Sequence, residues 1–111
     1  QSDLDRLADL LSDTNVLVCS DEVYEHMVFD GQQHHSASSH PALAARSFVV
    51  SSFGKTFHIT GWKVGYLVAG EALMQEIKKV HQFLVFSVNS VAQYALSAYL
   101  DQIDVNLLGP F

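Results

Sequence analysis

The chain has 111 residues, a formal net charge of −6 and one cysteine. An apolar share of 49% with a charged share of 16% is typical of a globular protein and argues against disorder. Twelve acidic residues against six basic ones leave no basic patch, which argues against nucleic acid or an anionic membrane as a partner. A single cysteine excludes an internal disulfide framework and fits a reducing compartment.

The first half of the chain predicts a helix, a strand and a long polar stretch. Residues 3–11 place their leucines on one face of a helix. Residues 16–19 form a continuous apolar run typical of a fully buried strand in a parallel sheet, so we expect Cys19 to be an inert core residue. A small extended piece is expected at residues 27–29, and residues 32–40 are expected to form a surface loop.

The second half predicts two more strands and three more helices. The expected elements are a short helix from Pro41 to residue 46, a strand at 48–50, a loop at 51–62, a strand at 64–68 and helices at 71–86 and 91–100. Helix and strand therefore alternate, as in α/β proteins. The first two strands can be parallel, and their carboxyl ends then meet at the sheet edge where such folds bind ligands.

Two polar clusters follow the first two predicted strands. Residues 20–26 read Ser-Asp-Glu-Val-Tyr-Glu-His, and residues 51–66 contain Ser-Ser-Phe-Gly-Lys followed by Thr-Gly-Trp-Lys-Val-Gly. Together they resemble the class I/II aminotransferases of pyridoxal-phosphate (PLP) fold type I. That family has an aspartate three residues before a tyrosine, then Ser-x-x-Lys, then a basic residue eight positions after the lysine. The matching residues here are Asp21, Tyr24, Ser52, Lys55 and Lys63.

The resemblance assigns a role to each matching residue. Lys55 would form the Schiff base with the cofactor and move a proton during catalysis. Asp21 would pair with the pyridine nitrogen and Tyr24 would donate to the ring oxygen. Ser52 and Lys63 would bind the phosphate, although a lysine lacks the bidentate geometry of an arginine. The amino-acid sequence of the second cluster most resembles the corresponding segment of kynurenine and methionine transaminases.

Each assignment has a structural alternative. Lys55 can be a solvated loop lysine, Asp21 a turn or helix-capping residue, and Tyr24 an ordinary half-buried tyrosine. A Ser-x-x-Lys motif alone also occurs at β-lactamase-type sites, so the joint match of both clusters carries the resemblance. Glu22 is the rival carboxylate, but the family spacing to Tyr24 selects Asp21.

Three histidines and one aromatic residue outside the motifs are weaker site candidates. We expect His34, His35 and His40 to be surface residues and not metal ligands, because they lack the usual ligand spacing. Phe86 falls where several transaminases place an aromatic side chain that enters the neighbouring subunit's site. A plain core or interface phenylalanine is the alternative at that position.

The resemblance also implies what kind of molecule the chain comes from. Whole members of the family are several times longer, so residues 1–111 are expected to be a central fragment of the large PLP-binding domain. That domain is α/β with a mostly parallel sheet, of which this chain would provide three strands, the third antiparallel. The isolated fragment is expected to be inactive, because the arginine that binds the substrate carboxylate cannot be assigned here.

The implied reaction is transfer of an amino group between an amino acid and a 2-oxo acid. A methionine, aromatic or glutamine-like donor is suggested by the resemblance, together with a cytoplasmic homodimer. One alternative is a PLP-dependent C–S lyase on the same scaffold, because both clusters bind the cofactor and not the substrate side chain. The other is a non-catalytic remnant.

Overall fold

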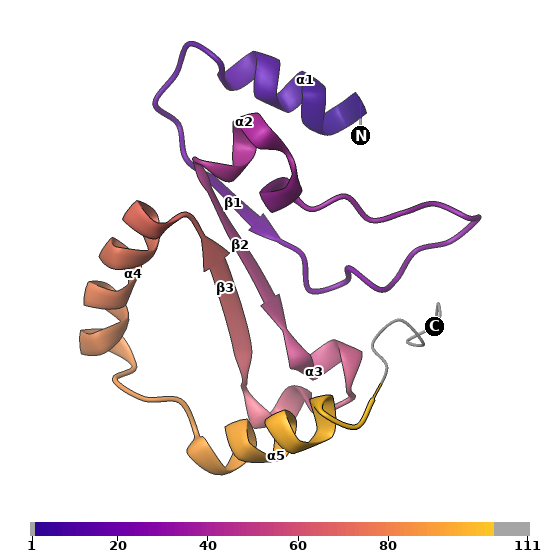
Figure 1. Cartoon of the computed structure of the whole chain (residues 1–111), viewed down its shortest axis with the longest axis vertical. Helices are drawn as coiled ribbons and strands as arrows, with labels where there is room; N and C mark the ends of the chain where they lie inside the picture. Colours follow the sequence, from indigo (N-terminus) through magenta and orange to yellow (C-terminus); the bar gives the residue numbers. More distant parts are fainter. Residues whose placement is uncertain (1, 104–111) are drawn as a thin grey trace.

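The computed structural model describes residues 2–103, in which helices and strands alternate around one small sheet (Figure 1). The elements in chain order are α1 (Ser2–Leu11), β1 (Val18–Asp21), η1 (Ala37–Ser39), α2 (Pro41–Ala44), β2 (Ser47–Ser52), α3 (Phe53–Thr56), η2 (Thr60–Trp62), β3 (Gly65–Ala69), α4 (Glu71–Leu84) and α5 (Ser90–Leu100). None of the helices in this part of the chain is long and apolar enough to cross a membrane.

The three strands lie in the order β1-β2-β3. β1 pairs with β2 in parallel and β2 pairs with β3 antiparallel, as the sequence predicts. The carboxyl ends of β1 and β2 therefore point toward the same end of the sheet as the start of β3, and α3 lies at that end (Figure 1). This arrangement brings both polar clusters to one end of the sheet.

The two faces of the sheet differ in how well the chain covers them. Alternate residues of β2 are buried, namely Ser47, Val49 and Ser51, and the segment between β1 and β2 covers this side with the fully buried Leu43. We call this side the covered face. On the other side, the open face, Cys19 is exposed. The expectation that Cys19 is a core residue is wrong, because nothing among residues 2–103 buries this edge of the open face.

Several element boundaries also differ from the prediction. β1 begins at Val18 and not at residue 16, because its partner β2 begins at Ser47, directly opposite Val18. Val16 and Leu17 consequently have no neighbouring strand and remain exposed. The extended piece expected at residues 27–29 is not a strand, the polar stretch 32–40 contains η1, and the loop expected at 51–62 contains α3 and η2.

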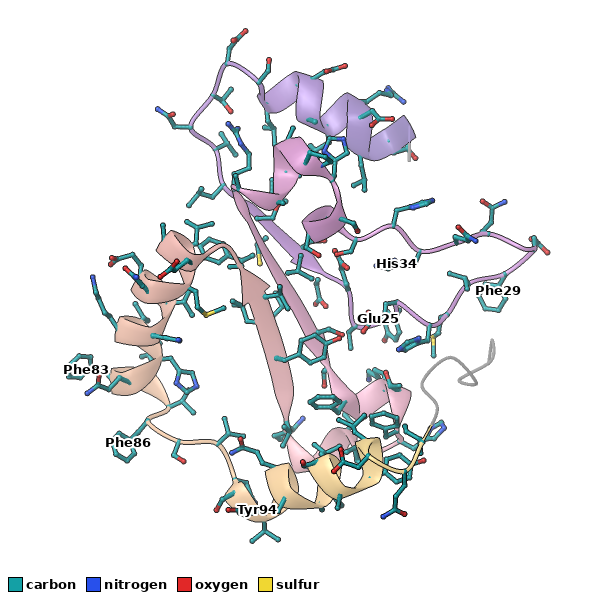
Figure 2. All side chains as sticks on the ribbon, in the orientation of Figure 1. Glu25, Phe29, His34, Phe83, Phe86 and Tyr94 are labelled. Carbon is teal, nitrogen blue, oxygen red and sulfur yellow. The ribbon has the colours of Figure 1, made fainter. Side chains whose placement is uncertain are left out.

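Large apolar side chains remain uncovered on α4, α5 and the segment between them. Figure 2 shows Phe83 and Phe86 pointing away from the sheet, and Tyr94 of α5 is 80% exposed. Phe86 is 81% exposed and has a positive φ of 63°, so it is not a core residue within the described chain. An apolar surface of this kind usually contacts another protein segment.

Candidate functional site

The serine that ends β2 determines where the helix carrying Lys55 begins. Ser52 is the N-cap of α3, and its Oγ accepts a hydrogen bond of 3.0 Å from the backbone N–H of Gly54. The same hydroxyl donates to the carbonyl of Val64 at 3.3 Å. Ser52 thus joins the end of β2 both to α3 and to the residue that precedes β3.

Aromatic packing holds α3 in place. Phe53 and Phe57 stack with ring centroids 6.0 Å apart, and each contacts a further ring at 5.3 Å, Tyr66 for Phe53 and Tyr99 for Phe57. Both phenylalanines also pack against a small core of Val64, Ala92 and Leu96. Lys55 lies between them in the sequence and is half-buried. Its amine forms no ion pair or hydrogen bond with the part of the chain that the structure describes.

Gly54 permits a close approach between α3 and η2. A Cβ added at Gly54 would lie 2.9 Å from the Cα of Thr60, and the Thr60 hydroxyl already donates to the Gly54 carbonyl at 3.0 Å. We therefore expect Gly54→Ala to displace α3 and to destabilise the complete protein by about 1–3 kcal/mol. A urea titration would measure this, with Gly70→Ala as the control because a Cβ there meets nothing within 4 Å. Equal midpoints for the two variants would contradict the expectation.

Asp21 and Ser52 lie on the same face at the same end of the sheet. Asp21 is the last residue of β1 and pairs with Val50, two residues before Ser52, so its side chain shares the open face with that of Ser52. Strand geometry places the two Cα atoms about 8 Å apart. Asp21 is exposed, and its Oδ1 accepts a hydrogen bond of 3.2 Å from the N–H of Val23.

Tyr24 and Lys63 are both exposed near this end of the sheet. Tyr24 follows β1 within a turn and is 55% exposed. Lys63 lies between η2 and β3 in the left-handed conformation, with φ 55°. Its neighbour Val64 accepts hydrogen bonds from Phe53 N at 3.3 Å and from Ser52 Oγ, so Lys63 lies just before β3 and beside the start of α3.

The rival carboxylate, Glu22, has other partners. Glu22 is buried, and its carboxylate accepts hydrogen bonds from Ser20 Oγ at 2.9 Å and Ala37 N at 3.0 Å, and pairs with His34 Nε2 at 2.9 Å. Burial alone would raise the pKa of Glu22, but the hydrogen bonds, led by that of His34, together hold it below its ordinary value. Glu22 is therefore committed to holding the loop after β1, which leaves Asp21 as the accessible acid.

Two of the three loop histidines pair with acids. His34 contacts Glu22, and His40 contacts Asp5 Oδ1 at 3.1 Å while its imidazole is only 11% exposed. The expectation that His40 is a surface residue is wrong, because it lies between α1 and the start of α2. Within residues 2–103 no group of three or more histidine, cysteine, aspartate or glutamate side chains could hold a metal ion.

A pocket of about 330 Å³ lies beside Ser52, between α3 and the side chains of Glu25 and Tyr66. Ser52 is the one residue of the five predicted site residues that lines it. The sheet topology places Asp21, Ser52, Lys55 and Lys63 at one end of the sheet. Three of them, Asp21, Lys55 and Lys63, do not line this pocket. The sequence prediction also missed the partners of Glu25, which lie on strands distant in the sequence.

A family model for aminotransferase class I and II matches residues 1–107 of the chain. Methionine aminotransferase of Escherichia coli K12 is 52% identical over 100 residues, which are 90% of this chain and 26% of that protein. Kynurenine–oxoglutarate transaminase of Dictyostelium discoideum is 39% identical over 104 residues, which are 92% of this chain and 24% of that protein. The chain thus spans about a quarter of the length of these relatives.

Solved structures agree with the sequence relatives. A crystal structure that identified a methionine aminotransferase function in Escherichia coli superposes with a TM-score of 0.87 at 50% identity, over 91% of this chain and 27% of that one. N-succinyldiaminopimelate aminotransferase of Mycobacterium tuberculosis gives a TM-score of 0.84 at 32% identity, over 91% of this chain and 26% of that one. Both have PLP fold type I. The chain therefore belongs to the class I and II aminotransferase family, whose members depend on pyridoxal 5′-phosphate.

Proposed function

We propose that the complete protein carrying this chain is a PLP-dependent aminotransferase and that Lys55 is the residue that binds the cofactor covalently. The observation that carries the proposal is the gathering at one end of the sheet of an accessible carboxylate, a capping serine and an amine for which residues 2–103 provide no ion-pair partner. On this proposal, residues 1–111 are the central part of the large PLP-binding domain.

The side chains at this end have the chemistry that PLP requires. Lys55 offers a primary amine, Asp21 a carboxylate on the open face, Tyr24 an exposed phenol and Lys63 an exposed cation. Ser52 can donate only one hydrogen, which now goes to the Val64 carbonyl at 3.3 Å. Because that bond is long, the hydroxyl can turn to a phosphate oxygen at little cost. The donor set therefore fits PLP.

Each of these residues then has a defined task. When bound, PLP supplies an aldehyde that takes up amino groups and a ring that withdraws electrons. Asp21 would keep a proton on the ring nitrogen, and Tyr24 would donate a hydrogen bond to the ring oxygen. Ser52 and Lys63 hold the phosphate. The amine of Lys55 would move the proton between the substrate α-carbon and the cofactor.

The proposed substrates are an amino acid donor and a 2-oxo acid acceptor. Similarity to a methionine aminotransferase and to kynurenine transaminases supports a methionine, aromatic or glutamine-like donor. A homodimer is proposed from the family resemblance, and the exposed Phe83, Phe86 and Tyr94 need a covering surface from a second copy or from the rest of the complete protein. A cytoplasmic location is supported by the single cysteine, which leaves no internal disulfide and fits a reducing compartment.

The attachment of PLP to Lys55 can be tested by reduction with borohydride. We expect the complete protein, incubated with PLP and reduced, to carry one pyridoxyl group on the peptide that contains Lys55. Lys79 is the internal control, since its amine is exposed and pairs with Glu76 at 2.6 Å. Labelling of Lys79 at the level of Lys55, or no labelling, would contradict the proposal.

Product analysis of the same preparation separates the two PLP reactions. A new amino acid formed from the 2-oxo acid indicates transamination. Ammonia together with pyruvate from a sulfur amino acid indicates C–S lyase chemistry and would overturn the proposed reaction while leaving the cofactor site intact.

A further inference from the structure

The turn that follows β1 alternates between side chains that are held and side chains that are accessible. Asp21 and Tyr24 are exposed, whereas Glu22 is buried and Glu25 is half-buried. The backbone closes this turn through a hydrogen bond of 2.9 Å from Glu25 N to the carbonyl of Glu22. Glu22 and Glu25, three residues apart, are therefore held by the protein, while the two proposed cofactor ligands remain accessible to solvent.

Glu25 ties the turn to the two following strands. Its Oε1 accepts a hydrogen bond of 2.7 Å from the Tyr66 hydroxyl and one of 3.1 Å from Ser51 Oγ. Ser51 and Tyr66 are direct partners across β2 and β3, so one carboxylate oxygen joins the turn to both strands on the covered face. The imidazole of His26 also lies near, with Nε2 4.0 Å from the same oxygen.

The Tyr66 phenol remains a hydrogen-bond donor in this arrangement. Burial raises the pKa of Tyr66, the contact with Ser51 lowers it, and Glu25 raises it further, so that it lies above its ordinary value of 10.0. At neutral pH Tyr66 is therefore protonated, and the carboxylate of Glu25 receives a charge-assisted bond.

Glu22 ties the same turn to the other side of the loop. Its N–H extends the β1–β2 ladder through a hydrogen bond of 2.8 Å to the Val50 carbonyl. Its carboxylate accepts hydrogen bonds from the Ser20 hydroxyl and the Ala37 N–H, and pairs with His34. Figure 2 shows Glu25 and His34 on the two arms of the long loop after β1. Glu25 thus holds the turn against β2 and β3, and Glu22 holds it against the part of the loop that leads back to η1.

We propose that Glu22 and Glu25 are positioning residues, which fix the turn after β1 from the covered face and so direct Asp21 and Tyr24 toward the cofactor. The inference rests on the proposed function, because it needs a cofactor at Asp21 and Tyr24. Neither acid touches the reacting atoms. Their effect is geometric, and a displacement of about 1 Å at a reacting group can cost roughly 100-fold in rate.

The experiment compares variants of the complete protein loaded with PLP. Glu25→Ala and Tyr66→Phe are each expected to weaken PLP binding about tenfold and to shift the pH at which the absorbance of the bound cofactor changes. The double variant should be no worse than Glu25→Ala alone, because Glu25→Ala already removes the contact with Tyr66. Glu25→Gln keeps an acceptor for Tyr66 and should restore most of the affinity.

Controls separate positioning from plain stability and from the proposed function itself. Glu76→Ala, which removes an exposed acid of α4, should leave the affinity for PLP and the absorbance titration unchanged. If Glu25→Ala lowers the thermal midpoint but leaves both cofactor measurements at wild-type values, the positioning role is overturned. If the wild-type protein carries no pyridoxyl group on Lys55 after reduction, the proposed function fails instead. Glu25 is the better site for this test, because removal of the more deeply buried Glu22 can prevent folding.

Discussion

Replacing Lys55 by alanine is expected to abolish amino transfer by the complete protein. On the proposed function, the variant loses both the amine that attaches the cofactor and the base that moves the proton. General acid–base catalysis by one side chain contributes about 10²–10⁴-fold, so the fall in kcat should be at least that large. Steady-state kinetics with an amino acid donor and a 2-oxo acid would measure it. PLP can still bind through Asp21, Ser52 and Lys63, so the cofactor should exchange freely without being lost.

A matched lysine variant controls this prediction. Lys79→Ala removes an exposed amine on α4 whose partner is Glu76, and kcat should stay within about twofold of wild type. Far-UV circular dichroism of both variants would show that each is folded. A Lys55→Ala protein with at least a tenth of the wild-type kcat would remove the basis for the assignment.

The second large effect is expected at Glu22, and it concerns stability. Glu22→Ala leaves the Ser20 hydroxyl, the Ala37 N–H and the imidazole of His34 without their acceptor. Removal of one partner from a buried charged network costs about 3 kcal/mol. A urea titration of the complete protein should show this loss, whereas Glu76→Ala should change the free energy of unfolding by less than about 0.5 kcal/mol.

The contribution of Glu22 to stability should also depend on pH. The folded state lowers its pKa below the ordinary value of 4.5, so the stabilisation is complete above that value and is lost as the pH falls through the lower, folded pKa. Glu22→Gln cannot ionise and should lack this part of the acid dependence. Wild-type and Glu22→Gln proteins with parallel stability curves between about pH 3 and pH 7 would contradict the assignment.

Local sequence pattern predicted the elements whose shape depends on near neighbours. The leucine spacing of α1, the apolar run of β2 and the proline that opens α2 all lie where the pattern indicated. The motif around Lys55 also predicted the family. These features depend on contacts within a few residues, or on a spacing that the sequence displays directly.

Contacts between distant residues were not predictable in this way. Glu22 meets His34 twelve residues later, and Glu25 meets Tyr66 forty-one residues later, so no local pattern marks either pair. The burial predicted for Cys19 assumed a sheet covered on both faces. The sequence predicts a loop where α3 forms, because residues 51–62 are rich in small and polar residues, although a serine such as Ser52 is a favoured N-cap.

The backbone at Lys63 indicates why a lysine stands there. A left-handed φ of 55° suits glycine, and any L-residue with a Cβ gives up roughly 1 kcal/mol of conformational energy to adopt it. A glycine at this position would relieve the strain and would also remove the cation. The chain instead keeps a residue with a Cβ in an unfavourable backbone conformation just before β3, which on the proposed function would be offset by the cofactor phosphate that Lys63 holds.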